Sequence, residues 1–267
     1  MFVTIINDCR DENAAGRQLT RAHALFGVAA TLVGVGSAIE RAETESDLEA
    51  AGNLLDVLDA GEGKEGVVLV NVAPRYGEAK QWENGTPFCY FSYRETLVLS
   101  SVAGRTLSLT KKLDLVETVT VLDLAEIGSV LAHARIVSEE EGARIASSQF
   151  RSFDVLPRAA LALSRGIELP GKPQAIAETL DAPRAVWFVD SFGNCKTTLL
   201  REDLGSTMLT INDTQIPFIA SLKDEPDGEA AAIVGSSGIG DRRFIEVVVQ
   251  GTSAVAEFGL KIGSRIE

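Results

Sequence analysis

The sequence predicts an α/β N-terminal domain with a central, mostly parallel sheet, plus a smaller all-β C-terminal domain. Strand-like and helix-like segments alternate through the first part of the chain, which is the pattern of a parallel sheet covered by helices. A polar stretch with proline and glycine follows, and short strands and turns fill the remainder. We therefore expect an N-terminal domain at residues 1–166, a linker at 167–184 and a C-terminal domain at 185–267.

Apolar spacing predicts the first elements of the N-terminal domain, namely strands at 2–6, 28–35 and 66–72 and helices at 16–26 and 46–59. The Val/Leu run at 66–72 is typical of a strand that is covered on both faces. In the second helix, Ser46 is expected to be the N-cap, with Glu49 three residues on as in a capping box.

The same patterns predict the later elements. In the N-terminal domain we expect strands at 88–99 and 116–122 and helices at 139–147 and 155–164. In the C-terminal domain we expect strands at 186–189, 207–211, 215–220, 230–234 and 244–249.

The charge balance limits the classes of partner. The formal net charge is -13 and the pI is about 4.7. A nucleic-acid-binding protein needs a basic surface to neutralise phosphates, and an anionic membrane surface also attracts basic segments. We therefore expect neither nucleic acid nor a membrane as partner, whereas a cationic small molecule is compatible with this charge.

Cysteine and histidine content limits the chemistry further. Cys9, Cys89 and Cys195 lie far apart without a C-x-x-C pair, and the chain has two histidines. This predicts no disulfide framework and no metal site. No basic segment followed by a long apolar run opens the chain, so we expect no signal peptide and a cytoplasmic location.

Residues 186–198 are the most informative segment of the sequence. The apolar run Val-Trp-Phe-Val leads into Asp-Ser-Phe-Gly-Asn, which predicts a strand followed by a tight turn at Gly193 and Asn194. The Asn194 amide offers both a donor and an acceptor, as an adenine edge requires. The alternative is an ordinary strand and turn with no ligand.

Four segments match one family in the same order along the chain. Residues 4–8 (TIIND) are similar to L-L-T-D-F-G, and 153–166 (FDVLPRAALALSRG) to D-I-F-A-P-A-A-A-x-L-A-x-G. Residues 190–198 (DSFGNCKTT) are similar to D-x-F-G-N-x-x-T-N, and 245–263 to L-E-I-A-x-x-x-G-x-A followed by L-G-L-x-x-G-D. The chain thus resembles the S-adenosylmethionine hydroxide adenosyltransferase family, which includes the chlorinases and fluorinases.

The resemblance implies an enzyme that binds S-adenosylmethionine as substrate, without a further cofactor, and displaces methionine at the ribose C5′ carbon. It also implies a homotrimer with each site between the N-terminal domain of one subunit and the C-terminal domain of its neighbour. Asp8 would hold the ribose, and the Gly/Ser segment 235–240, expected as a loop, could receive a carboxylate. The expected substrate-binding residues are Asp8, Tyr76, Phe192, Asn194, Ser236, Ser237 and Ser253.

The sequence departs from the family where water is activated. Ala73, Lys80 and Phe150 fall at the family's aspartate, arginine and histidine, so no catalytic residue is assigned. The candidates are Asn71, Arg75 and Lys80. Two hypotheses stay open: an adenosine-forming hydrolase or a related enzyme with another nucleophile, and a nucleoside-binding relative without turnover. A third alternative is an unrelated α/β protein whose matches arise by chance.

Overall fold

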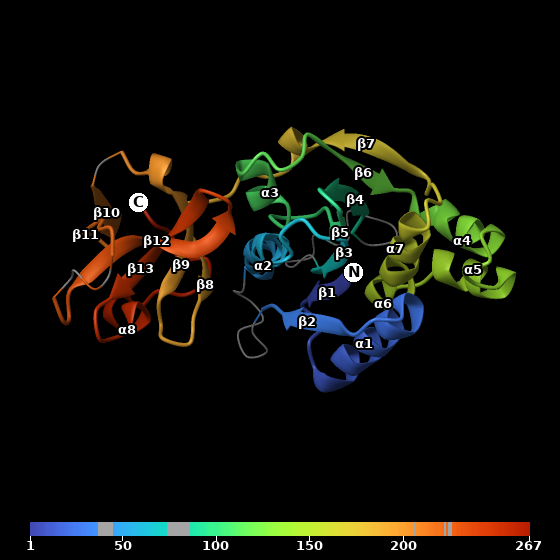
Figure 1. The fold of residues 1–267 in the computed structure, drawn as a ribbon, viewed down its shortest axis with the longest axis horizontal. Coiled ribbons are helices and arrows are strands. Elements are labelled where there is room, and N and C mark those ends of the chain that lie inside the picture. The colour runs from blue at the N-terminus through green and yellow to red at the C-terminus, as the bar shows by residue number, and fades with distance from the viewer. Residues whose placement is uncertain (37–44, 74–85, 206, 222, 224–225) are drawn as a thin grey trace.

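The computed structural model describes residues 1–36, 45–73, 86–205, 207–221, 223 and 226–267. The N-terminal region contains a large sheet with helices, and the C-terminal region is built mainly of strands (Figure 1). This arrangement confirms the predicted fold class.

The N-terminal elements follow in chain order. They are β1 (Phe2–Asn7), α1 (Glu12–Phe26), β2 (Ala30–Gly34), α2 (Ser46–Ala60), β3 (Gly66–Asn71), β4 (Phe88–Tyr93), β5 (Thr96–Ser101), α3 (Ser108–Lys112), β6 (Thr118–Leu122), α4 (Leu124–His133), α5 (Glu139–Ala146), α6 (Arg151–Asp154), α7 (Leu156–Ser164) and β7 (Gly171–Ala175).

The C-terminal elements are β8 (Val186–Val189), β9 (Cys195–Leu200), β10 (Met208–Ile211), β11 (Thr214–Pro217), β12 (Ala230–Ile239), β13 (Arg242–Val249) and α8 (Ala254–Phe258). None of the helices in the described ranges combines the length and apolar character needed to cross a membrane.

The large sheet has the strand order β2-β1-β3-β5-β4-β6-β7. Strands β2, β1, β3 and β5 are parallel neighbours, whereas β4 and β7 run in the opposite direction to the strands beside them. The parallel half brings the carboxyl ends of β1 and β3 together, with Asn7 opposite Asn71. Loops at this edge of a parallel sheet are where ligands usually bind.

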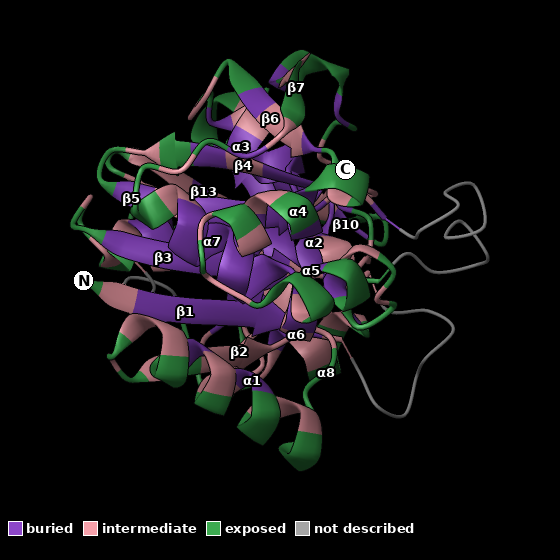
Figure 2. Ribbon diagram, turned by 90° about the vertical axis from the view of Figure 1, so that its right-hand side faces the viewer, coloured by how far each residue is buried: buried purple, intermediate pink, exposed green. Residues whose placement is uncertain are grey.

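Alternate residues of the central strands pack on opposite faces of the sheet. On β3, Val67 and Leu69 join the core beneath α1, α4, α5 and α7, while Val68 and Val70 join the core beneath α2. This double burial explains the uninterrupted apolar run. Figure 2 shows β1 and β3 buried along their length and the outer turns of α1 exposed.

The C-terminal region contains an antiparallel sheet in the order β12-β13-β9-β8 and a separate β10-β11 pair. One buried cluster lies within this region, and another joins Ala51 and Leu55 of α2 to Leu200 and Phe244. Trp187, which is 1% exposed, also faces α2, because a Cβ placed on Gly52 would lie 2.1 Å from its ring. Helix α2 is therefore packed between the two sheets (Figure 1).

The structure corrects several local predictions. The N-cap of α2 is Glu45 rather than Ser46, and it makes no side-chain capping bond; Glu49 instead accepts a hydrogen bond from the Gly36 N–H at 2.6 Å. Residues 235–239 belong to β12 and not to a loop, although the pairing is irregular between Val234 and Gly238.

Some elements were not predicted at all. They include strand β9, the short helices α3, α6 and α8, and helix α4. Strand β7 lies inside the range assigned to the linker and pairs with β6, so the large sheet extends into that range. The division of the chain into domains stays a prediction.

Candidate functional site

The turn between β8 and β9 is organised by Asp190. Its Oδ1 accepts hydrogen bonds from the backbone N–H groups of Phe192 (2.8 Å) and Asn194 (2.9 Å). Its Oδ2 accepts a further bond from Nδ2 of Asn194 at 3.0 Å. An aspartate that binds its own downstream backbone in this way is typical of a tight turn. The Asn194 amide is therefore held in one orientation, and its Oδ1 and second N–H have no partner among the residues that the structure describes.

Glycine is required at position 193 for two reasons. Its φ of +82° lies in the left-handed region, which a residue with a Cβ rarely adopts. A Cβ there would also lie 2.0 Å from the Ser253 Oγ. Ser253 is the N-cap of α8 and accepts from the Ala256 N–H at 3.2 Å. The structure thus places Ser253 beside the turn that carries Phe192 and Asn194; a binding role for these three residues stays a prediction.

Two side chains beside this turn have opposite exposure. Phe192 is 77% exposed, so its side chain is open to solvent. Cys195, one residue after Asn194, is buried, and burial together with the charge of Asp190 raises its pKa to about 12. The thiol therefore stays protonated at neutral pH and offers no nucleophile.

Asp8 lies in a loop held by buried amides at the carboxyl end of β1. The fully buried Asn7 accepts hydrogen bonds from the Cys9 N–H (2.9 Å) and from Nδ2 of Asn71 (3.1 Å), and donates to Gln18. Gln18 in turn donates to the Cys9 carbonyl at 3.3 Å. Both backbone groups of Cys9 are thereby fixed, and the Asp8 Oδ2 accepts from the Ala73 N–H at 2.9 Å.

Ser236 and Ser237 bind carboxylates of the protein itself. Glu246 accepts from the Ser236 N–H (3.0 Å) and hydroxyl (3.2 Å). The Ser237 Oγ, in a residue that is 2% exposed, lies 2.9 Å from Asp56 Oδ2 and 2.8 Å from Lys196 Nζ. Burial raises the pKa of Asp56, although Lys196 and Ser237 oppose this effect. Binding of a ligand carboxylate by these serines stays a prediction, and it would require these partners to be exchanged.

The remaining predicted residues are placed as follows. Asn71 belongs to the amide network below Asp8. Tyr76, Arg75 and Lys80 lie outside the described residues. Phe150, which the sequence predicts at the position of a family histidine, is 72% exposed. Among the described residues no group of three or more histidine, cysteine or acidic side chains is arranged to hold a metal ion.

Two structurally important residues have no role predicted from the sequence. Asp190 stabilises the turn by hydrogen bonds to it. Its position four residues before Asn194, with a glycine between them, indicates an Asx-type turn. Gln18 supports the Asp8 loop from α1, eleven residues from Asn7. Nothing in the local pattern identifies that contact, because it depends on how α1 packs beside β1.

The arrangement supplies two rigid polar groups and, within the described ranges, no evident base. The turn presents an exposed aromatic ring beside a fixed amide, which suits a planar base with a donor and an acceptor on its edge. A carboxylate at the end of a parallel strand suits paired hydroxyl groups. In this structure the Oδ1 atom of Asp8 is buried and its Oδ2 atom accepts from the Ala73 N–H, so a ligand would have to gain access to this carboxylate. The two groups lie in different regions of the chain, one in the large sheet and one in the C-terminal sheet.

Comparisons with known proteins match the chain to a family model and to solved structures. Residues 184–267 match the family model described as SAM hydroxide adenosyltransferase C-terminal domain, where SAM is S-adenosylmethionine. No curated protein matches the chain. An uncharacterized conserved protein from Thermotoga maritima has a similar structure, with a TM-score of 0.66 and 15% identity over 99% of this chain and 98% of that one. A conserved hypothetical protein from Thermus thermophilus has a TM-score of 0.56 and 21% identity, covering 100% and 99% of the two chains.

Proposed function

We propose a function from the match of residues 184–267, by which the chain belongs to the S-adenosylmethionine hydroxide adenosyltransferase family. The chain binds S-adenosylmethionine or a related adenosyl nucleoside and displaces methionine at the ribose C5′ carbon. In the proposed arrangement the chain forms a homotrimer. Each site then combines the Asp8 loop of one subunit with the β8–β9 turn of its neighbour.

The geometry of the β8–β9 turn carries this proposal. Asp190 accepts from one N–H of the Asn194 amide, and within the described ranges the carbonyl oxygen and the second N–H have no partner and can serve as an acceptor and a donor. Adenine presents the complementary pair on its edge. Phe192 is exposed beside this amide and offers a ring on which the base can stack.

The proposed chemistry makes few demands on the protein. Attack of water at C5′ breaks the carbon–sulfur bond, and methionine leaves as a neutral thioether while a proton is released with adenosine. The leaving group develops no negative charge, so no general acid is needed. The protein must hold the ribose in line with the nucleophile, for which Asp8 is suited, and must position that nucleophile. Water is the proposed nucleophile, and a halide is the alternative.

A second candidate function is supported by the residues at the water-activating positions. Ala73 and Phe150 carry no ionisable group, and the Phe150 ring faces solvent. A protein with an intact nucleoside-binding turn and no base could bind an adenosyl compound without converting it. Binding and turnover therefore have to be measured separately.

Binding is tested first by calorimetric titration with adenosine and with S-adenosylmethionine. We expect a Kd below about 1 mM, which corresponds to roughly 4 kcal/mol. Asn194→Ala should weaken binding by about 1–3 kcal/mol, because a base edge loses its hydrogen-bond partner. Phe192→Ala should weaken it by a similar amount, about 1–3 kcal/mol, through lost stacking.

Leu180→Ala is the matched control, because Leu180 is also a largely exposed apolar side chain. It should leave the affinity unchanged. Equal affinity of the wild type, Asn194→Ala and Phe192→Ala would contradict the adenine assignment.

Turnover is tested with labelled S-adenosylmethionine, with and without added chloride. We expect adenosine and methionine in equal amounts, and a 5′-chlorinated nucleoside if halide is the nucleophile. Asp8→Asn keeps an acceptor for the Ala73 N–H but removes the charge, and it should slow turnover by about a hundredfold through loss of ribose positioning. Binding without any product would favour the second candidate, and absence of both would overturn the proposal.

A further inference from the structure

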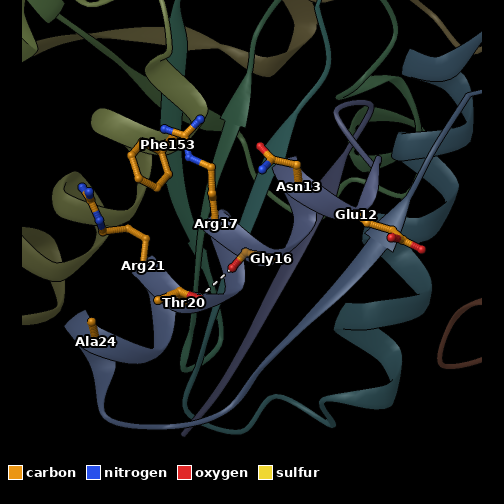
Figure 3. A pocket seen from close by; sticks show the side chains of 8 residues that line it. All are labelled: Glu12, Asn13, Gly16, Arg17, Thr20, Arg21, Ala24 and Phe153. Atoms are coloured by element: carbon orange, nitrogen blue, oxygen red, sulfur yellow. Dashed lines mark hydrogen bonds between the residues drawn. The ribbon is translucent and has the colours of Figure 1, made fainter.

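A groove of about 470 Å³ runs along the outer face of α1 beside α6 (Figure 3). Its volume lies within the range of small-molecule sites. Polar and basic side chains of α1 form most of its wall, and Phe153 forms the rest. The lining residues are Glu12, Asn13, Gly16, Arg17, Thr20, Arg21, Ala24 and Phe153.

Two arginines in this groove contact the same aromatic ring. The Cζ atoms of Arg17 and Arg21 lie 4.5 Å and 4.1 Å from the centroid of the Phe153 ring. Such contacts hold a guanidinium group in place through its face and leave the N–H groups at its edge to donate hydrogen bonds. Figure 3 shows both side chains reaching from α1 towards Phe153.

Neither guanidinium has an acceptor within the described part of the chain. The structure records ring contacts for Arg17 and Arg21, and the Nη1 atom of Arg21 is buried without a hydrogen-bond partner there. A buried donor without a partner is unfavourable, which is why such groups in native proteins usually bind water or a ligand.

The carboxylates near this groove are already paired. Arg144 and Arg158 bind Asp154 and Glu141, with the shortest contacts at 2.8 Å and 2.7 Å. Glu12, the acidic residue of the lining, points away from both arginines (Figure 3). Burial, followed by the positive charge of Arg21, lowers the pKa of Arg158. The groove is therefore locally cationic in a chain with a net charge of -13.

We propose that Arg17 and Arg21 form a binding site for a small multivalent anion that carries phosphate or carboxylate groups. Guanidinium groups bind both kinds of oxygen in a bidentate way, and these hydrogen bonds are stronger than neutral ones. Asn13 adds an amide donor at one end of the groove. None of the residues that line the groove belongs to the proposed nucleoside site, and this proposal does not depend on that function.

The test is calorimetric titration of the full chain at low ionic strength with diphosphate, inorganic phosphate and citrate. We expect at least one of them to bind with a Kd below about 1 mM, and Arg17→Gln and Arg21→Gln each to weaken binding about tenfold or more. The control is Arg165→Gln, which removes one positive charge from an exposed residue at the end of α7. It should leave the affinity within about twofold, because salt screens distant charges.

The probes separate the two ligand chemistries. Preference for diphosphate indicates a phosphate-bearing ligand, and preference for citrate a carboxylate-bearing one. Failure of all three anions to bind, or equal affinities for the wild type, Arg17→Gln and Arg165→Gln, would overturn the proposal. Arg17 is exposed, so Arg17→Gln decides the outcome even if Arg21→Gln does not fold.

Discussion

Replacing Asp154 with alanine is expected to lower the free energy of unfolding by about 3 kcal/mol, near the lower end of the range for breaking a buried ion pair. The Asp154 side chain is 3% exposed and accepts hydrogen bonds from Arg144 (2.8 Å and 3.1 Å) and Ser148 (2.5 Å). Its loss leaves the buried Arg158 with Glu141 as its remaining carboxylate partner. We expect a loss of free energy near the lower end of this range because Arg144, one of the two arginine partners, is half exposed.

The same carboxylate should make stability depend on pH. Burial raises the pKa of Asp154, but hydrogen bonds from Arg144 and Ser148 and the charges of Arg144 and Arg158 outweigh this effect, so the pKa is lowered. A lowered folded-state pKa means that the stabilisation is complete above the unfolded value of about 3.9. This stabilisation is lost as the pH falls through the folded-state pKa of Asp154.

Urea unfolding at neutral pH and through the acidic range measures both effects. In Asp154→Asn the free energy of unfolding should depend less on pH in the acidic range than in the wild type, because the titrating carboxyl group is absent. The control Asp181→Ala removes a carboxylate that pairs with Lys111 at 2.8 Å but is 88% exposed, and it should cost no more than about 1 kcal/mol. Equal losses for Asp154→Ala and Asp181→Ala would show that burial of the cluster contributes nothing.

Replacing Trp187 with alanine is expected to lower the free energy of unfolding by about 3–5 kcal/mol, as for other buried aromatic residues. Trp187 packs with Leu48 and Ala185 and contacts the Phe188 ring at 5.6 Å between centroids. It lies directly against Gly52 of α2, so the cavity would open between the two sheets. Its removal should weaken the contact between the two regions of the chain.

Trp187→Phe is the matched variant. It keeps most of the apolar ring and removes the indole N–H, which has no hydrogen-bond partner among the described residues. We expect a clearly smaller loss than for alanine, measured by urea unfolding followed by circular dichroism. If Trp187→Phe loses as much free energy of unfolding as Trp187→Ala, the indole N–H forms a hydrogen bond. A negligible loss for Trp187→Ala would contradict the close packing of Trp187 against α2.

Much of the fold could be predicted because apolar periodicity is a local property. The strands at β1 and β3 and the helix α2 follow directly from it. The unpredicted strands lack that pattern. Strand β7 is an edge strand with mostly exposed side chains and a proline, so it resembles a linker. Strand β9 buries Thr197 and Thr198, whose hydroxyls are satisfied by the carbonyls of Ile245 and Pro183.

Part of the candidate site could also be predicted from local sequence, and part could not. The Asp190 turn depends on residues within five positions of one another, so its sequence suffices to indicate it. The support of Asp8 by Gln18 depends on the position of α1 relative to β1. The sequence of the segment at 235–240 predicts a loop because glycine and serine are common in turns. In the structure β12 extends to Ile239, and Gly238 and Ile239 pair with Arg243 and Arg242 of β13.

The alternation of strands and helices, the apolar faces and the tight turn at Gly193 follow from local chemistry, since each depends on neighbouring residues. Contacts between distant side chains depend on the three-dimensional packing. Ser237 and Lys196 reach Asp56 across 181 and 140 residues of chain, and two arginines of α1 contact the Phe153 ring. Such contacts arise from how the layers stack, because apolar burial favours many packings and shape complementarity selects one of them.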